Sequence, residues 1–145
     1  MSVGNDEIVV RALHAPFWSE ELQRGTKSAF QQTDISVSRE KIVPYEDIVR
    51  IFKHDLDRPA SDSKPARQVR GTASLRVDQV LTACEIEKTK RKVNFVEKPE
   101  AGSLEKEKNL SHALMTVRDN KDNPKKLPDA AAFAVLELAT IKIVN

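Results

Sequence analysis

The sequence predicts one α+β domain, in which a mixed sheet of about five strands carries two or three helices. Short apolar runs that alternate with polar residues recur along the chain, which is typical of half-buried strands. In other segments the apolar residues recur every three or four positions, which is the spacing of one face of a helix. The length of 145 residues and the hydrophobic content of 39% fit a single core that needs no metal or disulfide to fold.

The first predicted strand is the run from Ile8 to Leu13. It is β-branched and apolar on both alternating faces, which favours burial on both sides, and Pro16 should end it. The same alternation predicts further strands at 35–38, 69–76, 93–96, 112–117 and 141–143.

The clearest helix is predicted at 44–54. Pro44 suits the first helical turn, and Tyr45, Ile48, Val49 and Phe52 form one apolar stripe. Helical spacing also predicts helices at 77–84 and 129–138. The remaining polar or charged stretches are expected to be a disordered start at 1–7 and mobile loops at 57–68, 97–108 and 119–128.

Composition restricts the partners of the protein. The formal net charge is +2, from 24 basic and 22 acidic residues, so bulk charge predicts neither nucleic-acid nor membrane binding. The single cysteine, Cys84, fits a reducing compartment, and the polar N-terminus lacks the apolar core of a signal peptide. We therefore expect a cytoplasmic protein.

A first group of candidate site residues lies in and just after the first strand. Arg11 stands in an apolar run, and a guanidinium cannot be buried without a partner. It either pairs with a carboxylate in the fold or lines a cleft that accepts an anion. His14 precedes Phe17 and Trp18, which either stack on a flat ligand or cap the open end of the core.

A second group follows Gly25. Lys27, Ser28 and Ser36 supply a cation and hydroxyls that either hold a phosphate or form turns. His112 opens a later strand and is either a general base or a hydrogen-bonding partner of the backbone. The candidate catalytic residues are His14, Ser28 and His112. The candidate ligand-binding residues are Arg11, Trp18, Lys27, Ser28, Ser36 and His112.

Several recognised chemistries have no support in the sequence. The P-loop spacing is absent, and Ser28 does not stand in a hydrolase elbow. Three dispersed histidines and one cysteine give no paired ligand spacing, so we expect no metal and no cofactor. Basic residues around the second helix form either a solvated face or a nucleic-acid patch. They are Arg67, Arg70, Arg76, Lys88, Lys90, Arg91 and Lys92.

Several short blocks follow one another along the chain. They are Arg11 with His14, Ser28-Ala29-Phe30, Ser36-Val37, Gly71 with Ala73-Ser74-Leu75, and Asn109 with His112-Ala113. In order and approximate spacing this set resembles an uncharacterised family of small bacterial proteins, over most of the chain. Pro16 is displaced from that family's pattern, and 97–108 is longer. The resemblance implies a site at these residues and no known activity.

Three functions remain open at this point. The first is a small accessory protein that binds a protein partner through its charged loops. The second is an enzyme or ligand-binding domain, loosely similar to ADP-ribosyltransferases, that uses Arg11, His14, Ser28, Ser36 and His112 in one polar cleft. The third is nucleic-acid binding through the basic patch.

Overall fold

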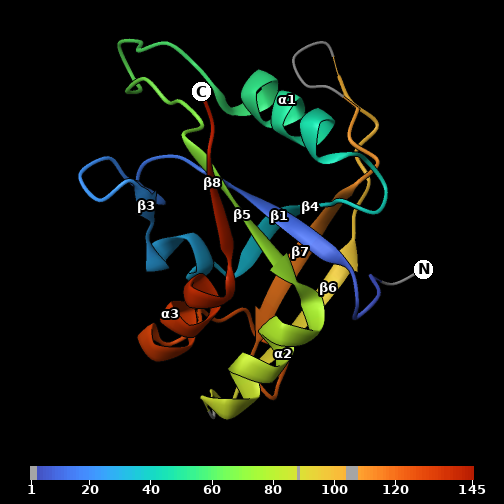
Figure 1. Cartoon of the computed structure of the whole chain (residues 1–145). Helices are drawn as coiled ribbons and strands as arrows, with labels where there is room; N and C mark the ends of the chain where they lie inside the picture. The colour runs from blue at the N-terminus through green and yellow to red at the C-terminus, as the bar shows by residue number, and fades with distance from the viewer. Residues whose placement is uncertain (1–2, 88, 104–107) are drawn as a thin grey trace.

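The computed structural model describes residues 3–87, 89–103 and 108–145 (Figure 1). The large sheet consists of β1 (Ile8–Leu13), β4 (Asp34–Arg39), β5 (Gly71–Arg76), β6 (Lys92–Glu97), β7 (His112–Arg118) and β8 (Thr140–Ile143). The helices are α1 (Tyr45–Leu56), α2 (Val77–Ile86) and α3 (Asp129–Leu138). A ribbon of β2 (Trp18–Ser19) and β3 (Arg24–Gly25) precedes a short 3₁₀ helix, η1 (Lys27–Phe30). The predicted α+β class and all three predicted helices are confirmed.

The sheet has the order β6-β7-β4-β1-β5-β8, and every pairing in it is antiparallel. It therefore has one more strand than predicted and is not mixed. The reason lies in the connections: α1 joins β4 to β5, which run parallel but are separated by β1. Such split β-α-β connections leave only antiparallel neighbours in contact.

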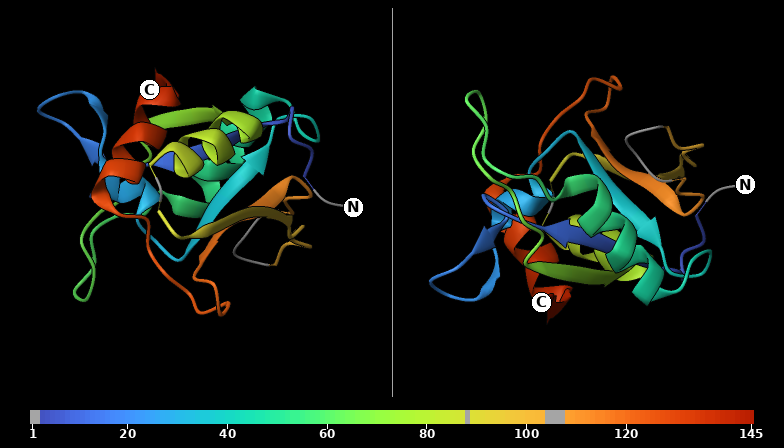
Figure 2. Two further views of the ribbon diagram at one scale, coloured as in Figure 1. Left: turned by 90° about the horizontal axis from the view of Figure 1, so that it is seen from below. Right: turned by 90° about the horizontal axis from the view of Figure 1, so that it is seen from above.

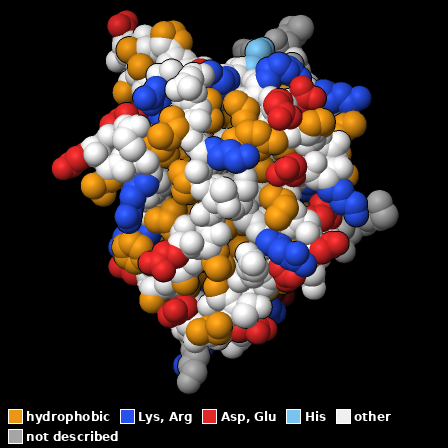
Figure 3. Space-filling view, in the orientation of Figure 1, with side chains coloured by type: hydrophobic (Ala, Val, Ile, Leu, Met, Phe, Trp, Pro, Cys, Tyr) orange, Lys and Arg blue, Asp and Glu red, His pale blue; other side chains and the backbone are white. Residues whose placement is uncertain are grey.

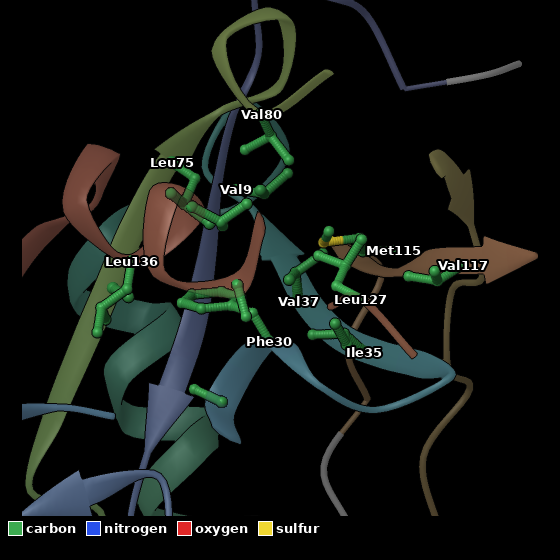
Figure 4. Packing of buried hydrophobic residues seen from close by; sticks show 14 of the residues in the cluster. Val9, Phe30, Ile35, Val37, Leu75, Val80, Met115, Val117, Leu127 and Leu136 are labelled. Carbon is green, nitrogen blue, oxygen red and sulfur yellow. The ribbon is translucent and has the colours of Figure 1, made fainter. Parts of the chain in front are cut away.

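Helices cover both faces of the sheet. Figure 2 shows α2 and α3 nearest the viewer from below and α1 nearest from above. The larger core lies under α2 and α3, where side chains such as Val9, Phe30, Met115 and Leu136 meet (Figure 4). A smaller core under α1 joins Val10 and Ala12 of β1 to Ile48, Phe52 and Val69. The apolar alternation of β1 on both faces follows from this double cover.

Helix α1 shows why the sequence prediction succeeded. Pro44 has φ −57° and precedes the helix, while Glu46 and Asp47 lie in its first turn, where carboxylates interact well with the helix dipole. The buried face of the helix carries Ile48, Ile51 and Phe52. The predicted stripe is therefore the face that packs on β1.

The polar segments are more structured than the sequence suggested. Residues 3–7 of the predicted disordered start are packed, since Val3 and Glu7 are both buried; residues 1–2 lie outside the described residues. Backbone hydrogen bonds explain the order in the predicted loops. β-Bridges join Arg58 to Arg67, Glu100 to Asn109 and Arg118 to Pro124, and residues 104–107 are not among those described.

Candidate functional site

A pocket of about 730 Å³ opens where the turn after β1 meets the segment between α1 and β5. It is a wide depression open to solvent and not an enclosed cavity. In Figure 1 both segments reach the upper left of the molecule. One wall carries Ala15, Trp18 and Glu20. The other wall is formed by Asp57, Arg58, Pro59, Ala66, Arg67, Gln68 and Arg70.

The second wall is built on a short hairpin, residues 58–67. Arg58 and Arg67 exchange both backbone hydrogen bonds, at 2.8 and 2.9 Å, and Ser61 N–H donates to the Lys64 carbonyl at 2.8 Å. Side chains of directly opposite residues lie on the same side of an antiparallel pair. The hairpin therefore places both side chains on the same side of the pair, but they reach in opposite directions along it, Arg58 toward Pro65 and Arg67 toward Leu56.

Each of the three arginines in the pocket wall is fixed through Nε. Arg58 Nε donates to the Pro65 carbonyl at 3.2 Å, and Arg67 Nε donates to the Leu56 carbonyl. Arg70 Nε donates to Glu20 Oε1 at 2.8 Å. Among the described residues, nothing binds the Nη groups of these three side chains. Guanidinium groups held in this way can bind an anionic group through two parallel hydrogen bonds.

The charge of Arg58 acts on Arg67 across the hairpin. Burial lowers the pKa of Arg67, and the charge of Arg58 lowers it further, while Asp57 acts in the opposite direction. Asp57 also accepts the backbone N–H of Val69 at 2.7 Å, so it is partly engaged elsewhere. The pair of Arg58 and Arg67 is therefore only partly neutralised by the protein.

His14 lies beside this pocket in a positive field. Burial lowers the pKa of His14 most, the hydrogen bond to the Ala15 carbonyl acts in the opposite direction, and the charges of Arg67, Arg11 and Arg58 lower it further, which favours the neutral ring. His14 Nδ1 lies 2.9 Å from the Ala15 carbonyl oxygen. A carbonyl can only accept, so Nδ1 carries the hydrogen and Nε2 is left as an acceptor.

Trp18 contributes a buried indole to the first wall. The side chain is 5% exposed, and its Nε1–H has no acceptor among the described residues. The opposite edge of the ring rests on Gly71, where an added Cβ would lie 2.6 Å from Trp18 Cζ3. Phe17 is buried as well, so both rings belong to the core and neither offers an open face for stacking.

Arg11 follows neither predicted interpretation. It is buried, and its Nε, Nη1 and Nη2 donate to the Ala29 carbonyl, the Ser36 carbonyl and Gln32 Oε1 at 3.1–3.2 Å. These acceptors are neutral, and burial lowers the pKa of Arg11 to about 10. β1 pairs with β4 only at Val9 and Val10. Where this backbone pairing has ended, the Arg11 guanidinium donates a hydrogen bond to the Ser36 carbonyl of β4 instead. Arg11 therefore supports the fold behind the pocket.

The block after Gly25 is structural. Thr26 Oγ1 and Ser28 Oγ both lie within hydrogen-bonding distance of the Pro16 carbonyl, at 2.9 and 3.3 Å, and hold η1 against the turn after β1. Lys27 instead forms an ion pair with Asp129 at 2.8 Å, at the start of α3. Ser28 therefore positions the first wall of the pocket, and Lys27 does not line it.

Ser36 and His112 lie away from the pocket. His112 is opposite Ser38 on β4, and Ser38 is opposite Val10, so His112 is level with the early part of β1. His112 Nδ1 lies 2.9 Å from the Lys98 carbonyl oxygen. The Ser36 side chain is exposed on the same face as Ser38, the face that α1 covers in part. Of the two residues only Ser36 contacts Arg11, through its carbonyl oxygen, and neither side chain is hydrogen-bonded to Arg11 or His14.

The predicted basic patch is divided among three places. Arg67 and Arg70 line the pocket, whereas Arg76 binds Asp78 at 2.8 Å at the far end of β5. Lys90, Arg91 and Lys92 line a separate pocket beside α2, and Lys88 lies outside the described residues. Within that group, Arg91 binds the Lys126 carbonyl and Lys92 binds Asp122. Figure 3 shows basic, acidic and apolar side chains intermixed on the face it displays.

Arg58 is the residue that the sequence analysis missed. The sequence could have indicated Arg58 by its position relative to Arg67. The two arginines lie on either side of a stretch with Pro59, Ser61 and Pro65, a composition that is typical of a turn. An arginine on each side of a turn is placed opposite the other when the turn closes into a hairpin.

No protein-family model, curated protein or solved structure matches this chain. Of the helices in the described residues, none is both long enough and apolar enough to cross a membrane. Across the same part of the chain, histidine, cysteine, aspartate and glutamate side chains form no group of three or more that could hold a metal ion. The pocket is therefore interpreted from its own chemistry.

Proposed function

We propose that this protein is a ligand-binding module that takes an anionic small molecule in the arginine-lined pocket. One observation carries the proposal: Arg58, Arg67 and Arg70 line a single pocket, each fixed through Nε and each with Nη groups that no described residue binds. Preorganised donors lose little side-chain freedom on binding, which favours affinity.

The arginines of the pocket wall favour a negatively charged ligand. Arg58 and Arg67 belong to opposite residues of an antiparallel pair, and the charge of Arg58 lowers the pKa of Arg67. An anion bound beside either guanidinium group offsets this repulsion. Arg70 is already paired with Glu20, so it contributes hydrogen bonds more than net charge.

Isothermal titration calorimetry with inorganic pyrophosphate tests the proposal. We expect binding by the wild type and a loss of affinity of roughly 10- to 100-fold in Arg58→Ala and Arg67→Ala, because hydrogen bonds to charged groups contribute about 1.5–3 kcal/mol each. Arg76→Ala is the matched control, since it removes an exposed arginine at the other end of β5. Equal affinity in all four proteins, or no binding by the wild type, contradicts the proposal.

The other hypotheses from the sequence stay predictions. Protein binding through the charged loops is compatible with the pocket, as is a cytoplasmic location. Nucleic-acid binding was expected to need convergence of the basic residues. Arg67 and Arg70 line the pocket, Arg76 pairs with Asp78, and Lys90, Arg91 and Lys92 line a separate pocket beside α2. For this reason the pocket is a better-supported site than a nucleic-acid surface.

A further inference from the structure

We propose that β8 pairs with β8 of a second copy of this chain, so that the two sheets join across a two-fold axis. β8 is the last strand of the sheet and, within the described residues, pairs with β5 alone. In Figure 1 it lies at the front of the molecule. Such an open edge offers its backbone N–H and C=O groups to a further strand. β8 contributes no residue to the arginine-lined pocket, so the inference does not depend on the proposed function.

The outward backbone groups of this edge belong to Ile141 and Ile143. Val144 N–H donates to the Arg70 carbonyl, just before β5, at 2.9 Å. The direction of the backbone groups alternates along an antiparallel pair, so those of Lys142 also face β5 and those of Ile141 and Ile143 face away from it. Two copies that lie antiparallel, with Lys142 at the two-fold axis, place Ile141 of each opposite Ile143 of the other. This register pairs all the outward N–H and C=O groups of β8.

The side chains along the edge complement one another in the same register. A pocket of about 200 Å³ is lined in part by Ile141, Phe133 and Leu136, and Ile143, two residues after Ile141 on the same side of the strand, is 56% exposed. Opposite residues of an antiparallel pair share a face of the sheet. Ile143 of one copy therefore lies beside Ile141 at the pocket of the other. The occupant is a second copy because β8 supplies both the apolar hollow and the exposed side chain that covers it.

Lys142 makes the association weak and dependent on salt. On the other face of the sheet it lies opposite Lys142 of the second copy, and like charges in that position repel. Its Nζ lies 4.4 Å from the centre of the Tyr45 ring, which holds the ammonium group toward α1 of its own copy. Salt screens the remaining repulsion. The dimer should therefore become stronger as the ionic strength rises, whereas a contact made by opposite charges would become weaker.

Sedimentation equilibrium tests whether the chain associates through this edge. The mass of the wild type should rise from 16.3 kDa toward twice that value between about 10 µM and about 1 mM, and more steeply in high salt. Ile143→Pro removes an outward N–H that β5 does not use. It should weaken association roughly 10- to 100-fold, because the symmetric pair loses two hydrogen bonds. Ile143→Val is the matched control, since it keeps the N–H and should associate almost as tightly as the wild type.

Lys142→Cys tests the register. Opposite residues that are not hydrogen-bonded have Cα atoms about 4.5 Å apart, which is within the range of a disulfide. Mild oxidation should cross-link Lys142→Cys much faster than Ile86→Cys, an exposed control on α2; Cys84 is buried and common to both variants.

Three results would overturn the inference. They are a wild type that stays monomeric up to about 1 mM, association that Ile143→Pro leaves unchanged, and cross-linking of Lys142→Cys no faster than that of the control. None of these measurements involves an anion, so the proposed function is judged separately by calorimetry.

Discussion

Arg11 illustrates how a buried cation can be accommodated without a carboxylate. Its guanidinium donates to two backbone carbonyls and to the Gln32 amide, and it lies 4.7 Å from the centre of the Phe17 ring. Burial without a counter-ion lowers its pKa, but the side chain remains charged at neutral pH. The carbonyls of Ala29 and Ser36 each accept one of these hydrogen bonds.

Replacing Arg11 should destabilise the fold. Arg11→Met keeps much of the side-chain volume but leaves buried carbonyls unpaired, so we expect a loss of about 1–3 kcal/mol in the free energy of unfolding. Arg11→Ala adds a cavity and should cost about 1 kcal/mol more. Urea denaturation measures both, with Arg76→Ala as an exposed control. If Arg11→Met is as stable as the wild type, these hydrogen bonds contribute nothing.

A second buried charge, Glu7, is held by a direct partner. Its carboxylate accepts from Arg39 Nε and Nη2 at 2.8 Å each, with the two side chains 2% and 8% exposed. The hydrogen bonds from Arg39 lower the pKa of Glu7, against the opposing effect of burial. The unfolded chain therefore binds a proton at Glu7 more readily than the folded protein does.

The pH dependence of stability follows from the direction of that shift. Because the folded pKa of Glu7 is depressed, its stabilising contribution is fully present above the ordinary glutamate pKa of about 4.3 and is lost as the pH falls through the lower, folded value. Glu7→Gln should cost about 3 kcal/mol at pH 7, and the difference from the wild type should shrink on acidification below about pH 4. Urea denaturation at several pH values measures it, with the exposed Glu21→Gln as control. A difference that is constant from pH 7 to pH 3 contradicts the assignment.

At the scale of elements, β5 and the first wall of the pocket approach each other closely at Gly71. A Cβ at Gly71 would lie 2.6 Å from Trp18 Cζ3 and 3.0 Å from the Lys142 carbonyl oxygen on β8. The backbone of β8 and the buried indole both resist displacement. Glycine at this position therefore determines where Trp18 lies.

Gly71→Ala should both destabilise the protein and displace the indole. We expect a loss of about 1–3 kcal/mol, typical of overpacking, together with a change in the fluorescence of the sole tryptophan. Gly25→Ala is the control for stability, because its added Cβ meets the side-chain ends of Leu136, Leu13 and Ile141, at 3.1, 3.2 and 3.8 Å, and no backbone atom. It should cost less than Gly71→Ala. An unchanged spectrum in Gly71→Ala would show that the indole is free to move.

The elements also show how far sequence patterns reach. α1 could be predicted because an apolar stripe, a leading proline and acidic residues in the first turn all agree. β2 and β3 could not, because each has two residues and shows no periodicity. The hairpin at 58–67 was predicted only as a loop. Its order comes from backbone hydrogen bonds, which any amino-acid composition can form, so the composition of the segment does not indicate them.

The candidate site was predicted less well than the fold. Trp18 lines the pocket, and the charges of Arg67 and Arg58 in the pocket wall act on His14. Both residues were among the candidates. The order of strands in the sheet was the missing information. Nothing in the chain reveals that β7 pairs with β4 in a register that takes His112 away from the end of β1.

At the scale of the whole molecule, polar groups gather at two separate ends of the sheet. One end carries the pocket and His14, just after Leu13 of β1. The other carries the Glu7–Arg39 pair and a buried network in which Asn109 joins Ser38 to Ser111. His112 follows this network along β7. The two ends should therefore respond independently to substitution, because distant sites with no shared partners are close to additive.

His112→Ala tests that independence. Loss of the hydrogen bond to the Lys98 carbonyl should lower the free energy of unfolding by about 1 kcal/mol. The affinity for pyrophosphate should change by less than about two-fold, in contrast to the large loss expected for Arg67→Ala. Calorimetry and urea denaturation of the two variants, alone and combined, give the coupling between the ends. A ten-fold loss of affinity in His112→Ala would mean that the imidazole acts on the pocket after all, as the sequence first suggested, and that the two ends form one functional unit.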